Sequence, residues 1–162
     1  MLLVKVFQAL NRDKVRYLVI GGVATILYGN PRFTKDLDLW VDPAENNLKT
    51  LVHTFQSLKF IPRNPVKAEE FISSETRARW KKEKGMLAFT FINPKNPFEN
   101  IDLLFEGPAS FARAYQKKKV FYSKRVPVPT ISRADLIEMK RRAGRDQDLY
   151  DLEFLKASRR RA

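Results

Sequence analysis

The stretch VIGGVATILYGNPRFTKDLDLWVDP, residues 19–43, decides which fold this sequence can adopt. It begins with an apolar run typical of a buried strand and then breaks at two consecutive glycines, Gly21 and Gly22. A short amphipathic segment follows, and a second turn comes at Gly29 before another apolar run. This order predicts a strand, a glycine turn, a short helix and a second strand.

The second predicted strand carries two carboxylates, Asp36 and Asp38. Side chains two residues apart in a strand point the same way, so these carboxylates can converge on one point. They repel each other unless a cation lies between them, and their oxygen ligands suit Mg²⁺. Two such ions, roughly 3.5–4 Å apart, can hold the attacking and leaving oxygens of a phosphoryl transfer. The same pattern also occurs on solvated strand surfaces, so it gains its weight from the preceding glycine turn, whose backbone can approach phosphate.

A third acidic residue, Asp102, lies within the apolar segment 100–105. A charge in such a strand is costly unless it is paired or bound to a metal. We therefore expect Asp102 to join Asp36 and Asp38. The alternative is a structural ion pair with an arginine.

Periodicity and turn residues predict an α/β (α+β) fold with a mixed central sheet flanked by helices. We expect one domain over residues 1–162, with C-terminal helices at about 132–158 beside the site. The expected strands are residues 15–20, 36–41, 86–92, 100–105, 120–122 and 126–128. The expected helices are residues 2–11, 22–28, 43–58, 108–115, 132–143 and a last one from 146.

Residues 68–84 are charged and fit neither period well. We expect a helical turn at 68–71 and a flexible basic loop beyond it. Trp80, inside this loop, is expected to pack in the core, with stacking on a nucleobase as the alternative. The only histidine, His53, is expected to have no catalytic role.

The net charge of +13 is the strongest feature of the composition. Such a field attracts polyanions, although it can also serve solubility alone. The chain has no cysteine and no apolar run long enough to span a membrane, so we expect a cytoplasmic protein without disulfides. The basic residues concentrate at 77–84, 117–125, 133–145 and 159–161.

Residues 17–42 resemble the signature of the polymerase-β-like nucleotidyltransferase superfamily, in which Gly-Gly, a spacer and Asp-x-Asp follow one another. Two later segments narrow the resemblance. LIEMK at residues 136–140 and RDQDLYDL at 145–152 are similar to the lysine motif and the Arg-x-x-Asp-Leu-Tyr-Asp-Leu motif of small prokaryotic nucleotidyltransferases related to AbiEii-type toxins. The resemblance implies a minimal nucleotidyltransferase fold.

The resemblance also implies a site. Asp36, Asp38 and Asp102 would hold two Mg²⁺ ions, with Mn²⁺ as a substitute, and Asp102 would help to deprotonate the acceptor hydroxyl. Lys140 would neutralise the leaving pyrophosphate, although it can also be one member of a basic helix face. The nucleotide-binding residues that the resemblance implies are Gly21, Gly22, Arg32, Thr34, Arg145 and Asp148.

These features together predict a metal-dependent enzyme that moves an NMP unit from an NTP to a hydroxyl of an acceptor, most plausibly RNA such as a tRNA end. The resemblance further implies a toxin–antitoxin setting and an antitoxin protein as partner. The alternative is a non-catalytic module that keeps the fold and binds nucleic acid or a protein through its basic surface.

Overall fold

The structure, a computed structural model, describes residues 2–157, with the side chains of residues 2, 97 and 98 left out of the description. Within these residues, seven strands are interspersed with helices. The strands are β1 (Tyr17–Val19), β2 (Leu37–Val41), β3 (Ile61–Pro62), β4 (Ala88–Asn93), β5 (Asn96–Leu104), β6 (Lys119–Ser123) and β7 (Val126–Thr130). The helices are α1 (Leu2–Arg12), α2 (Gly21–Leu27), α3 (Glu45–Ser57), the 3-10 helix η1 (Ala68–Ile72), α4 (Ser74–Lys84), α5 (Phe111–Gln116), α6 (Arg133–Ala143) and α7 (Asp146–Ala157).

The strands form one mixed sheet in the order β3-β4-β5-β2-β1-β7-β6. The pairs β2–β5 and β1–β7 are parallel, whereas β1–β2, β3–β4, β4–β5 and β6–β7 are antiparallel. The predicted mixed sheet flanked by helices is therefore confirmed. The central strands β2 and β5 carry Asp38 and Asp102.

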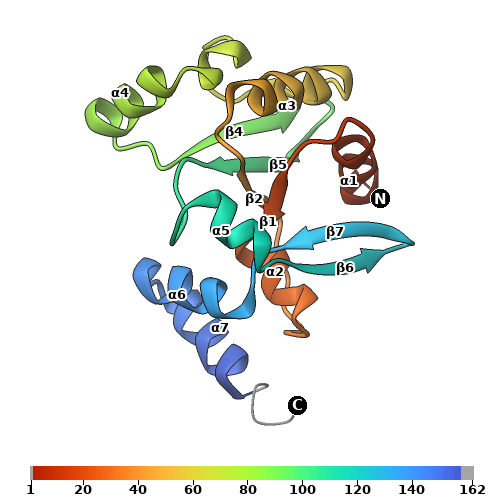
Figure 1. Ribbon diagram of the computed structural model, residues 1–162, viewed down its shortest axis with the longest axis vertical. Coiled ribbons are helices and arrows are strands. Elements are labelled where there is room, and N and C mark those ends of the chain that lie inside the picture. The colour runs from red at the N-terminus through yellow and green to blue at the C-terminus, as the bar shows by residue number, and fades with distance from the viewer. Residues whose placement is uncertain (1, 158–162) are drawn as a thin grey trace.

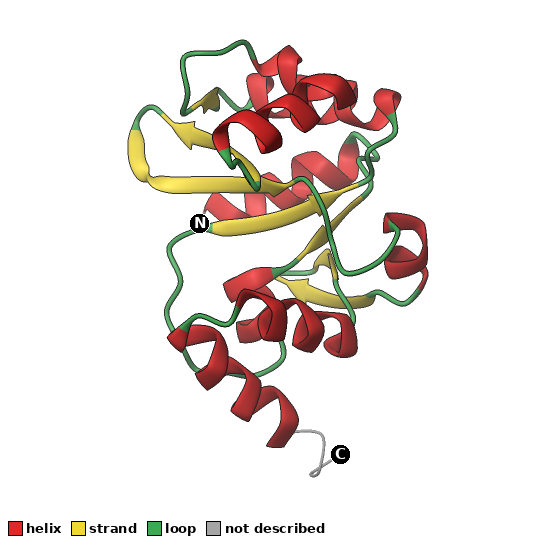
Figure 2. Cartoon of the chain, turned by 90° about the vertical axis from the view of Figure 1, so that its left-hand side faces the viewer, coloured by secondary structure: helices red, strands yellow, loops and turns green. Residues whose placement is uncertain are grey.

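Helices cover the sheet at both ends. In Figure 1, α3 and α4 lie at the top beside β4, whereas α6 and α7 lie at the bottom below α2. Figure 2, turned by 90°, shows the longest strands crossing the middle of the molecule with helices above and below them. Buried apolar side chains form a core that extends from Val4 in α1 to Leu155 in α7. The C-terminal helices therefore share the core of the sheet.

The segment 74–84 differs from the prediction of a flexible basic loop, because it forms helix α4. Ser73 caps its N-terminus by accepting a hydrogen bond from the backbone N–H of Thr76, and Gly85 ends it in the left-handed conformation. Seven of the eleven residues of α4 are charged, so the sequence of this helix shows no apolar period. Trp80 is buried, as predicted, and stacks on Phe89 with 5.3 Å between ring centroids.

The start of α3 also differs from the predicted helix over residues 43–58. The helix begins at Glu45, after the N-cap residue Ala44. Asp42 accepts a hydrogen bond from the Ala44 N–H at 3.0 Å and forms an ion pair with Arg16 at 2.7 Å. None of the helices that the structure describes has the length and apolar content needed to cross a membrane.

Candidate active site

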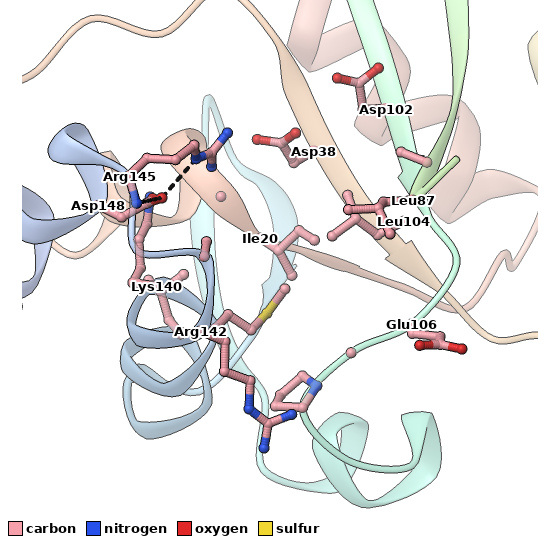
Figure 3. Close-up of a pocket in the computed structure, with 17 residues that line it drawn as sticks. Ile20, Asp38, Leu87, Asp102, Leu104, Glu106, Lys140, Arg142, Arg145 and Asp148 are labelled. Carbon is pink, nitrogen blue, oxygen red and sulfur yellow. Dashed lines mark hydrogen bonds and ion pairs between the residues drawn. The ribbon is translucent and has the colours of Figure 1, made fainter. Parts of the chain in front are cut away.

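Two carboxylates, Asp38 on β2 and Asp102 on β5, lie beside each other in the centre of the sheet. The two strands run parallel, and the two residues are direct partners in the register. Residues paired in this way project from the same face of the sheet, which brings their side chains together. Both line one pocket of about 580 Å³, and Figure 3 shows them at the same end of it.

The absence of a side chain at Gly21 leaves space for the carboxylate of Asp38. Gly21 begins α2 with a φ of +60°, and a Cβ atom there would overlap the Oδ2 atom of Asp38. The backbone N–H of Gly22 donates a long hydrogen bond, 3.5 Å, to the same oxygen. This position therefore requires glycine both for its backbone conformation and for the close approach of Asp38.

The site disfavours a second negative charge. Burial, followed by the charge of Asp102, raises the pKa of Asp38 to about 6. Asp102 accepts a hydrogen bond from the Thr90 hydroxyl at 2.6 Å, whereas the nearby cation Lys140 hydrogen-bonds other carboxylates. Adjacent carboxylates with oxygen donors facing a pocket are a donor set that fits a divalent cation.

The third predicted ligand, Asp36, is directed elsewhere. Its Oδ1 accepts a hydrogen bond from the Asn100 side chain at 3.0 Å, and it lines a separate pocket of about 240 Å³. Over residues 2–157, no three carboxylate or histidine side chains are grouped closely enough to hold a metal ion. The predicted convergence of three carboxylates is thus absent. Asp36 precedes β2, which starts at Leu37, so the alternation of a strand does not fix its direction.

Lys140, on α6, is buried with only 5% of its surface exposed. Its Nζ donates hydrogen bonds to Asp148 at 3.0 Å and to Asp151 at 2.7 Å, both on α7. Asp148 also accepts from Nε of Arg145 at 2.7 Å, an exposed arginine that lines the pocket. Burial raises the pKa of Asp148, but the hydrogen bonds from Arg145 and Lys140 outweigh it and hold that pKa below its usual value. Asp148 thus contacts both Lys140 and Arg145.

Asp151 joins α7 to α6 and to the loop that follows α2, and sequence reasoning assigned it no role. It is fully buried and accepts hydrogen bonds from Arg32 at 2.9 Å and from Asn30 at 3.2 Å, in addition to Lys140. The only signal in the sequence was its place one helical turn after Asp148 in the second motif. Its partners could not be identified before α7 was placed against the loop that follows α2.

Three predicted nucleotide-binding residues, Gly22, Arg32 and Thr34, do not line the main pocket. A Cβ on Gly22 would lie 2.5 Å from Nη2 of Arg32 and 2.6 Å from Oγ1 of Thr34. These residues pack behind the glycine turn, so their contacts hold the turn in place. Gly21, Lys140, Arg145 and Asp148 do line the pocket with Asp38 and Asp102.

Sequence reasoning also missed the apolar wall of this pocket. It consists of Ile20, Leu87, Ala88, Leu104, Pro108, Leu136, Met139 and Ala143. These residues come from five separate segments, and apolar side chains of this kind are ordinary core candidates in a sequence. Their common pocket is visible only in the folded chain.

Comparison with known protein families gives one match that covers almost the whole chain. The family described as "Nucleotidyl transferase AbiEii toxin, Type IV TA system" matches residues 7–161. Among curated proteins, none matches the chain.

Solved structures with a similar fold are nucleotidyltransferases. ANT(2″)-Ia, solved with adenylyl-2″-tobramycin, has a TM-score of 0.63 at 16% identity, over 97% of this chain and 87% of that one. The lincosamide antibiotic adenylyltransferase LnuA, solved with lincomycin, has a TM-score of 0.60 at 14% identity, over 95% and 94%. TM1012 from Thermotoga maritima, a proposed nucleotidyltransferase, has a TM-score of 0.61 at 16% identity, over 97% and 91%. At these identities the similarity concerns the fold.

Proposed function

The chain belongs to the AbiEii family of nucleotidyltransferase toxins, and from this premise we propose that it moves an NMP unit from an NTP to a hydroxyl of an RNA acceptor, such as a tRNA end. The reaction would depend on a divalent cation, Mg²⁺ or Mn²⁺, and would release pyrophosphate. The observation that carries the proposal is the register pair of Asp38 and Asp102 at one end of the pocket.

Asp38 and Asp102 are the residues that we assign to the metal. Both carboxylates face the pocket, and burial together with the charge of Asp102 raises the pKa of Asp38, so a bound cation would favour its ionised form. Asp36 would become a third ligand if its side chain left Asn100. When bound, the divalent ions would neutralise the charge that accumulates on the phosphoryl oxygens and orient the reacting groups.

The protein's own residues would hold the two substrates in position. Asp102 would accept the proton of the attacking hydroxyl, because it lies in the pocket beside Asp38. Arg145, between α6 and α7, would contact the phosphates, because its side chain is exposed and lines the pocket. Lys140 would act on the leaving pyrophosphate mainly through its charge, since two of its N–H donors already bind carboxylates.

The remaining predicted residues would act on the glycine turn. Gly21 would let the phosphate chain approach the backbone. Arg32 and Thr34 pack against Gly22, and Arg32 is tied to Asp151, so we assign them to the shape of the turn. Arg32 and Thr34 would thus support the turn rather than make the direct contact with the nucleotide that the sequence had predicted.

Positive charge near the pocket supports a polyanionic acceptor. The last turn of α4 carries Lys81, Lys82 and Lys84, and the last turn of α6 carries two exposed arginines. One of these arginines, Arg142, lines the pocket. Glu106 also lines it and forms an ion pair with Lys81 at 2.6 Å. Basic helix ends on two sides of the pocket favour a nucleic acid that lies across it.

The description of the family as toxins of a toxin–antitoxin system supports a second partner. We propose that an antitoxin protein counteracts the activity of this chain. Expressing the chain alone and with a co-encoded candidate gene would test this, because only the co-expressing cells should keep growing.

The direct test is incubation with each α-labelled NTP, Mg²⁺ and total RNA, followed by a denaturing gel. We expect label from at least one NTP to enter an RNA band with the wild type and no label with Asp38→Asn. Labelling that persists in Asp38→Asn at the wild-type rate would contradict the assigned site. Binding of RNA without any transfer would favour the non-catalytic module.

A further inference from the structure

The main pocket has two chemically different halves. One half holds the carboxylates of Asp38 and Asp102 and faces the ionic cluster of Lys140, Arg145 and Asp148. In Figure 3, the side chains of Ile20, Leu87 and Leu104 lie between this charged end and Glu106. Phosphoryl transfer uses the charged half and leaves the apolar half without a role.

The apolar half is formed from two opposing sides. Ile20 follows β1, Leu87 precedes β4 and Leu104 ends β5, so these three side chains come from the sheet. Met139 comes from α6, and Pro108 from the loop before α5. A pocket with apolar walls on a sheet and on a helix suits a flat ring between them.

Leu87 is the most informative member of this surface, because 70% of its surface is exposed. Its backbone carbonyl accepts the N–H of Phe105 at 3.1 Å, so its position is fixed beside β5. Leu87 lines the pocket together with Leu104, so its exposed side chain is available to a ligand there.

Resting on the proposed function, we propose that the apolar half is the nucleobase subsite for the NTP. The base lies between Leu87 and Leu104 on the sheet side and Met139 on α6. The triphosphate then extends toward Asp38 and Arg145. Thioether sulfur makes favourable contacts with aromatic rings, and this supports Met139 as one face of the subsite.

The position of the apolar half favours the base of the NTP over a base of the acceptor. Both substrates carry nucleobases, and a base gains free energy from leaving water between apolar walls. The base of the NTP is linked to the triphosphate that would occupy the charged half, so it can reach the adjoining apolar half. The basic side chains that an acceptor strand needs lie at the ends of α4 and α6, and one of them, Arg142, also lines the pocket.

The test compares NTP binding with binding of inorganic tripolyphosphate, which has the charges but no base. We expect the wild type to bind at least one NTP about 10-fold more tightly than tripolyphosphate, in calorimetry with Ca²⁺ to prevent turnover. Leu87→Ser and Met139→Ala should each remove most of this difference and leave the affinity for tripolyphosphate unchanged. Because Leu87 is exposed, Leu87→Ser should not disturb folding.

The matched control is Leu149→Ala, an exposed leucine on α7 outside the pocket, which should keep the full preference for NTP. If both pocket variants kept that preference and instead raised the KM for RNA, the apolar half would belong to the acceptor and the subsite assignment would be wrong. If the wild type bound no NTP and transferred no label, the proposed function would fail together with the subsite.

Discussion

Asp38 and Asp102 are direct partners across two parallel strands, β2 and β5, and both open into the same pocket. Backbone pairing fixes the Cα atoms of the two residues beside each other, so both side chains start from neighbouring positions on the sheet. Two carboxylates held beside each other repel when both are ionised, and a cation between them relieves this repulsion. The predictions that follow depend on this repulsion and on the contacts that surround the two carboxylates.

The first prediction concerns the two carboxylates themselves. Asp38→Asn and Asp102→Asn should each lower the rate of nucleotidyl transfer by at least about 100-fold, because even residues that only support a metal ligand cost 10- to 100-fold. Initial rates with labelled NTP would measure this, and circular dichroism would show that the fold is kept. Asp146→Asn, an exposed residue outside the pocket, is the control and should keep the wild-type rate.

The second prediction concerns pH. The pKa of Asp38 is about 6 in the folded protein against an ordinary value of 3.8, so the native state binds more protons than the unfolded state between these values. The free energy of unfolding should therefore fall as pH rises from about 4 to 7, by on the order of 2–3 kcal/mol. Urea unfolding in the presence of a chelator would measure the slope.

Asp38→Asn removes this titration, so its stability should depend less on pH in the same window. Equal slopes for the wild type and this variant would show that Asp38 ionises normally. Adding Mg²⁺ to the wild type should recover part of the lost stability above pH 6, because a bound cation favours the ionised form.

The third prediction concerns the glycine turn. Gly21→Ala should abolish transfer, because the new Cβ would displace the Asp38 carboxylate. Gly85→Ala is a matched control, since Gly85 has a similar φ of +61° but no atom within 4 Å of the new Cβ. Both variants should lose about 1–2 kcal/mol of stability from the left-handed backbone, and only Gly21→Ala should lose activity. Rates and unfolding curves of the two variants, compared side by side, would separate the effects.

The fourth prediction concerns the buried ion pairs. Asp151→Asn should lower the free energy of unfolding by about 3–5 kcal/mol, because it leaves Lys140 and Arg32 buried without their shared carboxylate. Lys140→Met should be similarly destabilising, and the double variant should lose less than the sum of the two. Chemical denaturation of the three variants would measure this.

The control for the ion pairs is Glu138→Gln, which breaks surface pairs with Arg141 and Arg142 on the same helix. Exposed pairs of this kind contribute little, so the change should stay within about 1 kcal/mol. A loss for Asp151→Asn no larger than for Glu138→Gln would mean that the buried contacts do not stabilise the fold.

The sequence predicted the strands that carry Asp38 and Asp102 because those strands depend on local patterns, whereas the parallel pairing of the two strands joins distant segments. Alternation places Asp38 on one face of its strand, and the apolar surroundings of Asp102 place it in a buried strand. Helix α4 was missed because its only buried side chain is Trp80, although Ser73 and Gly85 mark its two ends. A cap signal deserves more weight than periodicity in a segment that is mostly charged.

The rest of the site depends on contacts between distant segments. Asp36 precedes β2, so strand alternation does not direct its side chain, and it accepts a hydrogen bond from Asn100 on β5. Asp151 meets Arg32 across 119 residues of sequence, and no local pattern specifies such a meeting. The apolar wall of the pocket is equally invisible, because Leu87 and Met139 look like ordinary core residues until their neighbours are known.

The contact between Asp151 and Arg32 also affects how the protein is made. A ribosome synthesises β2 and β5, with Asp38 and Asp102, before it reaches α7. Until α7 emerges from the exit tunnel, the loop after α2 lacks its anionic anchor and Lys140 has no counterion. The contacts that hold this loop and the buried lysine can therefore form only after α7 has been synthesised.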